Sequence, residues 1–70
     1  MNFGKSLAEL RKKHKYTQKE VSEHLGISRA AWSHYENNRR FPDYMTLRSI
    51  ADFFKVKIDE LVSSGEGGDH

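Results

Sequence analysis

The side chains with the clearest chemistry in this chain are the basic ones, and they gather in one part of the sequence. Residues 1–41 hold nine Lys or Arg and four Asp or Glu, a net charge of +5. Residues 42–70 hold three Lys or Arg and six Asp or Glu, a net charge of −3. A basic part joined to an acidic part indicates a surface for a polyanion, although small helical proteins often carry uneven charge without such a partner.

Other kinds of chemistry find little support in the sequence. The chain has no cysteine, which excludes a disulfide and a cysteine-based zinc site. His14, His24 and His34 are ten residues apart, which is not a spacing for metal ligands on one helix. No set of Ser, His and Asp suggests a nucleophile on so small a domain. We therefore expect no metal, no cofactor and no enzymatic activity.

The length and hydropathy of the chain limit how many domains and membrane spans it can contain. A chain of 70 residues supports one domain, which we expect over residues 1–62, followed by a flexible Gly/Ser-rich tail at 63–70. No apolar run approaches the ~20 residues that a membrane span needs, and the N-terminus has no secretory apolar segment. A soluble, cytoplasmic protein without a membrane partner is the expectation.

The elements that must position the basic side chains are helices. Apolar residues recur at helical spacing in five segments, and the alternation typical of strands persists nowhere. The expected helices run from Phe3 to His14, from a cap at Thr17 to Leu25, from a cap at Ser28 to about Asn37, from Tyr44 to Phe54, and from Ile58 to Val62. The start of the last helix is poorly signalled, because Lys57 stands where a cap is expected.

Residues 18–37 carry the most information. Thr17 and Glu20 form a capping box, Gly26 ends the helix that follows, and Ser28 caps the next one. So short a junction makes the two helices cross sharply, as in a helix-turn-helix, whose second helix can enter the major groove of DNA. The motif also needs a small residue at the crossing and apolar residues facing inward. These are Ser22, and Val21, Leu25, Ile27, Trp32 and Tyr35.

With these residues in place, the chain resembles the phage repressor and Cro-like (XRE-type) helix-turn-helix domains over about residues 4–62. The matching segments are Leu7-Ala8-Glu9-Leu10-Arg11, Tyr16-Thr17-Gln18-Lys19-Glu20-Val21, Leu25-Gly26-Ile27-Ser28-Arg29, Ser33-His34-Tyr35-Glu36-Asn37, Arg40-Phe41-Pro42, Thr46-Leu47 and Ile50-Ala51. The resemblance implies a compact five-helix all-α bundle in which the second and third helices bind double-stranded DNA.

The resemblance also implies roles for individual residues. Four residues at the start and outer face of the third helix are expected to face base edges: Arg29, Ala30, Ser33 and His34. Contacts to the DNA backbone are expected from Thr17, Gln18, Ser28, Asn37, Asn38, Arg39 and Arg40. Arg29 could pair with guanine or reach only a phosphate, and His34 could equally be a solvated histidine. Gln18 could also be an ordinary exposed first-turn residue.

Arg11 and Glu36 correspond to a family salt bridge that ties the first helix to the end of the third. Four positions depart from the family pattern, and one of them is Asp43, an acidic residue that is poorly suited to a minor-groove contact. Ser22 replaces alanine, so its hydroxyl must find a backbone carbonyl, and Trp32 replaces a smaller core residue. Asn38 stands where glycine is frequent and can adopt the left-handed conformation.

The resulting expectation is a transcription regulator, most simply a repressor, that binds an inverted-repeat operator as a dimer. Phe53, Val56, Ile58, Leu61 and Val62 are candidates for a dimer face and equally for the core. Two alternatives remain open. The chain could be an antitoxin-like module that binds a protein partner, which an exposed apolar patch on the fifth helix would favour. It could also be the DNA-binding fragment of a larger regulator.

Overall fold

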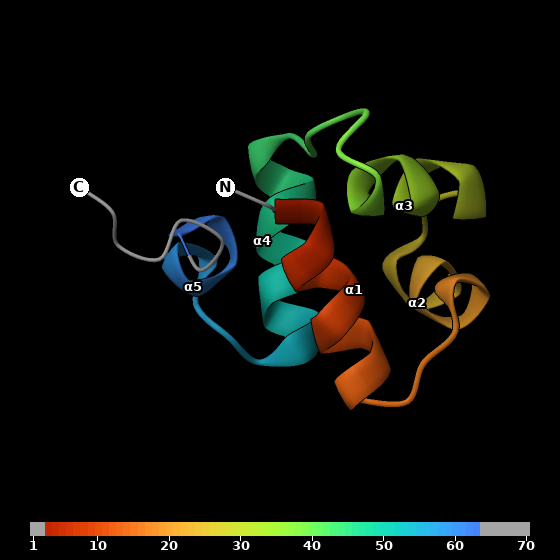
Figure 1. Ribbon diagram of the computed structural model, residues 1–70, viewed down its shortest axis with the longest axis horizontal. Coiled ribbons are helices and arrows are strands. Elements are labelled where there is room, and N and C mark those ends of the chain that lie inside the picture. The colour runs from red at the N-terminus through yellow and green to blue at the C-terminus, as the bar shows by residue number, and fades with distance from the viewer. Residues whose placement is uncertain (1–2, 64–70) are drawn as a thin grey trace.

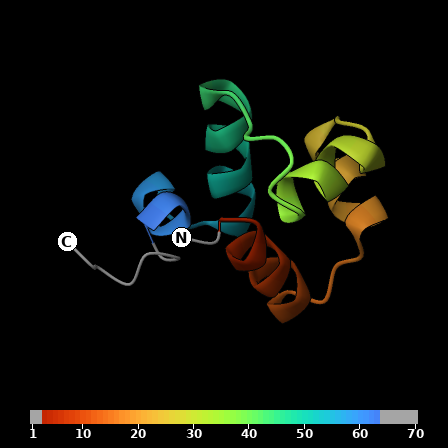
Figure 2. The ribbon, with the colours of Figure 1, turned by 45° about the horizontal axis from the view of Figure 1, so that its top comes forward.

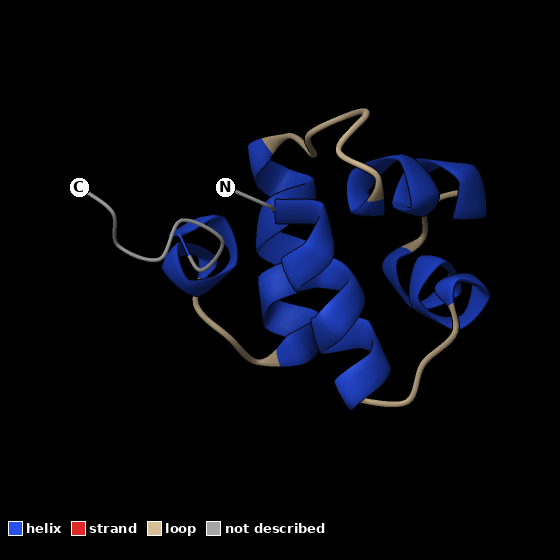
Figure 3. Ribbon diagram, viewed as in Figure 1, coloured by secondary structure: helices blue, strands red, loops and turns tan. Residues whose placement is uncertain are grey.

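The computed structural model describes residues 3–63, and within that range the chain forms five helices and no strand (Figures 1 and 3). These helices are α1 (Phe3–Lys13), α2 (Gln18–Leu25), α3 (Arg29–Glu36), α4 (Tyr44–Phe54) and α5 (Ile58–Ser63). The all-α, five-helix prediction is confirmed, and the helix bounds agree with the expected ones to within a residue or so. The tail expected at 63–70 lies outside the described residues except for Ser63, which ends α5.

Side-chain caps explain why three of the helices begin where they do. The Thr17 hydroxyl accepts a hydrogen bond from the Glu20 N–H at 3.0 Å, and the Glu20 carboxylate accepts one from the Thr17 N–H at 2.8 Å. Ser28 caps α3 by accepting from the Ala31 N–H at 3.0 Å. Asp43 caps α4 by accepting from the Thr46 N–H at 2.8 Å, and this bond lowers the pKa of Asp43 below its ordinary value. Each bond satisfies an amide that the first helical turn leaves unpaired.

The start of α5 uses only half of such a capping box. Lys57 has no side-chain acceptor for the first-turn amides, but its own N–H donates to the Glu60 carboxylate at 2.8 Å. Glu60 therefore fixes the entry of the chain into α5 in the way that Glu20 does for α2.

The core lies where the helices meet, and its centre is aromatic and aliphatic. Trp32, Leu7, Ile50 and Val21 are the largest fully buried side chains. The rest of the core is Phe3, Tyr35, Leu47, Ala51, Phe54 and Leu61. Trp32 at 0 % exposure shows that the bundle accommodates the large side chain at that position, with the Tyr35 ring 6.4 Å away. Of the dimer-face candidates, Leu61 is core, and Phe53, Val56, Ile58 and Val62 pack partly buried against it.

Two views show how these helices are placed (Figures 1 and 2). The pair α2–α3 lies at one side of the molecule and α5 at the other, with α1 and α4 between them. The helix α1 contacts both α3 and α5, so it links the two sides. No helix in the described part of the chain has the length and apolar character that a membrane span requires.

The contact between α1 and α3 depends on Gly4. A Cβ atom at this position would lie 2.1 Å from the backbone carbonyl oxygen of Glu36, so only glycine allows the start of α1 to approach the end of α3 so closely. The Gly4 N–H donates to the side-chain oxygen of Asn38 at 3.0 Å, which secures the same junction.

Candidate nucleic-acid interface

The turn between α2 and α3 sets the direction of α3. Gly26 adopts the left-handed conformation with φ 72°, and the Ile27 N–H donates to the Ser22 carbonyl at 3.0 Å. Ser22 is 2 % exposed, and its hydroxyl donates to the Lys19 carbonyl at 2.9 Å. The hydroxyl that replaces alanine at the helix crossing is thus satisfied within its own helix, as predicted. The sharp crossing leaves the N-terminal end of α3 exposed.

Four of the predicted DNA-contacting residues lie around one hollow. Gln18 at the start of α2 and Arg29, Ala30 and Ser33 on α3 line a depression of about 400 Å³. Arg29 and Ala30 are exposed, and Gln18 and Ser33 are half-buried. Since the second and third helices present both a guanidinium and a side-chain amide here, the hollow combines groups suited to base edges and to phosphates.

The remaining predicted base-contacting residue, His34, lies at the edge of this arrangement. His34 is half-buried and is not part of the hollow. Its carbonyl accepts hydrogen bonds from the Arg39 N–H at 2.9 Å and the Arg40 N–H at 3.4 Å. The structure therefore gives the main chain of His34 a role in shaping the loop after α3, beside any contact its ring makes.

The loop after α3 carries four of the predicted backbone-contacting residues. Asn37, Asn38, Arg39 and Arg40 are all exposed. Asn38 adopts the left-handed conformation with φ 60°, as its chemistry allows, and its Oδ1 atom accepts from Gly4. Because a phosphate oxygen also accepts hydrogen bonds, this commitment of Oδ1 does not compete with a phosphate contact. Asn37 donates from Nδ2 to the Ser33 hydroxyl at 3.3 Å, which joins the loop to the hollow.

Glu36 connects this surface to the core. Its carboxylate accepts from Arg11 Nε at 2.6 Å and Arg11 Nη2 at 3.3 Å, which confirms the predicted salt bridge. The Trp32 indole N–H donates to the same carboxylate at 2.5 Å, and Gln18 Nε2 donates at 2.9 Å. The Glu36 and Arg11 side chains are only 7 % and 13 % exposed. A buried carboxylate is tolerated here because donors surround it.

The surroundings of Glu36 also set its charge state. Burial on its own raises the pKa of Glu36, but hydrogen bonds from Arg11, Gln18 and Trp32, together with the positive charge of Arg11, outweigh burial and lower the pKa below its ordinary value of 4.5. Glu36 is therefore ionised at neutral pH and holds all four donors.

The bonds from Gln18 and Trp32 to Glu36 are not part of the family pattern used for the sequence predictions. Gln18 directs one amide hydrogen at Glu36, and its other amide hydrogen and its carbonyl oxygen take no part in that bond. Trp32 and Glu36 are four residues apart on one helix, so their contact could have been predicted from spacing. The bond from Gln18 joins two helices, and nothing in the local sequence indicates it.

Comparison with known proteins shows which family this chain is similar to. The sequence profile of the helix-turn-helix domain family matches residues 4–64. The transcriptional regulator ImmR of Bacillus subtilis is 41 % identical over 66 residues, which are 94 % of this chain and 52 % of the relative. The transcriptional activator BcrR of Enterococcus faecalis is 39 % identical over 66 residues, 94 % of this chain and 32 % of the relative.

A phage protein is among the relatives. The cryptic phage CTXphi transcriptional repressor RstR of Vibrio cholerae is 31 % identical over 64 residues, covering 91 % of this chain and 58 % of the relative. The chain thus spans between about a third and three fifths of the length of these curated relatives. The match over most of its own length, together with the crossed α2–α3 pair, shows that the chain belongs to the helix-turn-helix domain family.

Proposed function

We propose that this chain is a sequence-specific double-stranded DNA-binding domain of a transcription regulator, and that it reads DNA with the N-terminal part of α3. The observation that carries the proposal is the hollow formed by Gln18, Arg29, Ala30 and Ser33. It joins the start of α2 to the exposed end of α3, which is the geometry that a helix-turn-helix uses in the major groove. The names of the relatives, all transcriptional regulators, support the same conclusion.

In this proposal the contacts to the DNA backbone flank the contacts to bases. On one side, the N-terminus of α2 offers Thr17, Gln18 and first-turn amides to a phosphate, where the helix dipole favours an anion. Ser28 caps α3 beside them. On the other side, the segment from Asn37 to Arg40 offers two amides and two guanidinium groups to phosphates.

The bases are then read from between these two backbone contacts. Arg29 can donate two hydrogen bonds to guanine, and Ala30 can contact a thymine methyl group. Ser33 can donate or accept, and His34 reaches the bases or the adjoining phosphate from the edge of the surface. The exposure of Arg29 and Ala30 is consistent with both contacts.

The wider regulatory role is also part of the proposal. A pair of such domains related by a two-fold axis matches an inverted repeat with half-sites one helical turn apart. We propose that occupancy of such an operator represses transcription, as the name of RstR states for that relative, whereas BcrR is named an activator. A reporter gene placed behind the selected operator separates the two outcomes by the sign of its response.

The alternative that the chain is a protein-binding module can be compared with the exposed surface of the structure. An exposed apolar patch on the fifth helix would favour this alternative. In the described part of the chain, the exposed large apolar side chains are instead Phe41, Tyr44 and Met45. The alternative of a fragment fits the partial coverage of the relatives, and the activity of a longer protein would then include whatever its other regions add.

Selection of random duplex DNA by the purified chain tests the proposal. We expect wild type and the control variant Ser49→Ala, altered on α4 outside the hollow, to enrich the same short sequence. Arg29→Ala should lose the preference at one base pair while retaining binding to DNA, since only a base contact is removed. Folded wild-type protein that enriches no sequence, or an Arg29→Ala variant with unchanged preference, would contradict the proposed reading.

A further inference from the structure

In the described part of the chain, the helices α1, α2, α3 and α4 all end in the same backbone motif. One residue after each helix adopts the left-handed conformation, with φ between 60° and 72°. Its own N–H donates to the carbonyl three positions earlier, and the next N–H donates to the carbonyl five positions earlier, which is the Schellman arrangement. The residues at the left-handed position are Lys15, Gly26, Asn38 and Lys55.

Two of these positions hold residue types that favour the left-handed conformation, and the other two do not. Glycine has no Cβ atom to clash there, and asparagine enters this region more readily than most residues. Lysine has neither advantage, so Lys15 and Lys55 are held in a conformation that costs the fold stability. Because the hydrogen bonds of the motif are all made by the backbone, glycine at either position would keep them.

The helix dipole explains only part of this use of lysine. A positive charge near the C-terminal end of a helix is stabilising. The last turn of α4 contains no basic residue, so Lys55 complements the dipole of that helix. The last turn of α1 already contains three basic residues, so the dipole gives no reason for a further one at Lys15.

The two lysines lie at the same end of the molecule. The ring of His14, which precedes Lys15, lies 5.3 Å from the ring of Phe54, which precedes Lys55. The ring of Tyr16, which follows Lys15, also packs against Phe54, at 6.5 Å. Figure 1 shows the turns after α1 and α4 together at the lower edge of the molecule.

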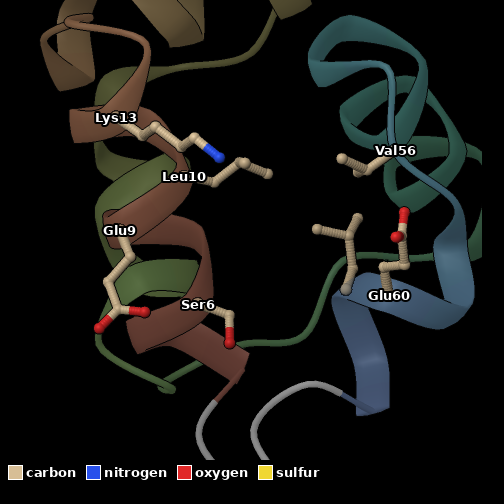
Figure 4. Close-up of a pocket in the computed structure, with 7 residues that line it drawn as sticks. Ser6, Glu9, Leu10, Lys13, Val56 and Glu60 are labelled. Carbon is tan, nitrogen blue, oxygen red and sulfur yellow. The ribbon is translucent and has the colours of Figure 1, made fainter.

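Both lysine side chains are available to an anion. Lys15 and Lys55 are exposed, and neither side chain has an ion pair or a hydrogen bond within residues 3–63. Three more exposed lysines stand within three residues of the pair: Lys12, Lys13 and Lys57. Figure 4 shows that Lys13 extends over the groove between α1 and α5, which it lines, so we do not count it with the pair.

We propose that Lys15 and Lys55 form a second surface for phosphates, which holds the duplex that flanks the bases read by α3. Lys15 stands three residues before Gln18, so it continues the phosphate contacts proposed at the start of α2. The loop that carries Arg39 and Arg40 lies at the upper edge in Figure 1, so the lysine pair extends the contacted surface at the opposite end. The choice of DNA as the polyanion rests on the proposed function, whereas the conformational cost of the two lysines does not.

Replacement of the lysines by glycine separates this role from a structural one. Lys15→Gly and Lys55→Gly relieve the left-handed strain, so the melting temperature measured without DNA by circular dichroism should stay the same or rise. Each variant also loses one phosphate contact, so its affinity for duplex DNA should fall, more for Lys15→Gly because that residue is the nearer to Gln18. Lysines kept only for stability would give the reverse, a lower melting temperature and an unchanged affinity.

Fluorescence anisotropy with labelled duplexes of two lengths measures the affinity. The short duplex carries one half-site of the selected sequence, and the long one extends it by about one helical turn at each end. On the long duplex, the variant with both glycines should lower the slope of log affinity against log salt by about two. The affinity advantage of wild type should therefore shrink roughly tenfold between about 50 and 200 mM salt. On the short duplex, wild type and the double variant should bind alike.

Two control variants accompany these measurements. The double variant with Lys15→Arg and Lys55→Arg keeps both charges and should bind the long duplex as wild type does. Arg48→Ala removes one exposed charge from the side of α4 that faces the groove with α5, and it should change neither affinity.

Three results would each overturn the inference: a double glycine variant that binds the long duplex as tightly as wild type, one whose loss is equal on both duplexes, or one whose melting temperature falls along with its affinity. A wild type that gains affinity from duplex length on every sequence alike overturns only the sequence-specific reading in the proposed function. A wild type that binds no duplex overturns both.

Discussion

Replacement of Glu36 by glutamine tests how far the binding surface depends on one buried carboxylate. The change keeps the shape of the side chain and removes its charge. Glutamine offers a single acceptor oxygen, whereas the carboxylate accepts two hydrogen bonds from Arg11 and one each from Gln18 and Trp32. The new NH₂ group also points a donor at other donors, and the guanidinium of Arg11 loses its counter-charge.

The magnitude follows from the burial of this pair. Removing one partner of a buried ion pair costs about 3–5 kcal/mol. Arg11 is 13 % exposed and keeps its bond to the Tyr16 carbonyl at 2.9 Å, so we expect a loss of about 3 kcal/mol, at the lower end of that range. A domain of this length has only about 4–10 kcal/mol of stability. Glu36→Gln should therefore lower the melting temperature by about 15 °C.

Urea unfolding measures this loss. The chain has a single tryptophan, Trp32, whose fluorescence reports unfolding, and circular dichroism provides a second probe that does not depend on the indole environment. The midpoint should fall without a change in the slope, because the surface exposed on unfolding stays the same. Glu23→Gln, the same substitution at an exposed site on α2, is the control and should change stability little. A loss below about 1 kcal/mol for Glu36→Gln would refute the role assigned to the network.

The pH dependence provides an independent check on the same residue. Since the folded state lowers the pKa of Glu36 below 4.5, the stability that its charge contributes is fully present above pH 4.5. It is lost as the pH falls through the lowered pKa of the folded state, because protonated Glu36 leaves Arg11 without a counter-charge. The gap in unfolding free energy between wild type and Glu36→Gln should therefore narrow on acidification, and a constant gap would contradict this assignment.

Three further substitutions extend these predictions. Gly4→Ala should destabilise the chain by about 1–3 kcal/mol in thermal unfolding, because its Cβ would clash with the Glu36 carbonyl; wild-type stability would show that α1 can move away. Trp32→Phe should cost about 2 kcal/mol or more in urea unfolding, because the indole N–H bond to Glu36 is lost; a neutral effect would remove Trp32 from the network. Replacing both Arg39 and Arg40 by alanine should reduce the slope of log affinity against log salt by about two, and an unchanged slope would mean that neither contacts a phosphate.

The parts of the fold that were predictable from the sequence are those fixed by local chemistry. Thr17, Ser28 and Asp43 are side chains that satisfy first-turn amides, and Gly26 is the residue that most easily reverses the chain in the left-handed conformation. Each of these residues acts on backbone groups only a few positions away, so the sequence alone is enough to predict where the helix begins or ends. The same applies to α5, because Glu60 stands three residues after Lys57, the capping-box spacing that would have predicted the start of this helix.

Contacts between residues far apart in the sequence were harder to predict. Gly4 and Asn38 are 34 positions apart, and neither type of residue indicates the other. Gln18 was predicted to contact DNA because of its place at the start of α2, and its bond to Glu36 emerges only when α2 and α3 are assembled. The exposed pair Tyr44 and Met45 follows a loop and begins a helix, and local spacing does not show that α4 leaves this face uncovered.

The most direct test of the central claim is amide chemical-shift mapping of the uniformly ¹⁵N-labelled chain during titration with a duplex that carries one half-site of the selected sequence. We predict the largest shifts at Thr17 and Gln18, from Ser28 to His34, and from Asn37 to Arg40, with small changes over α5. Shifts concentrated on α5 or the α1–α5 groove, with the start of α3 unaffected, would show that the chain does not bind DNA through the surface described above.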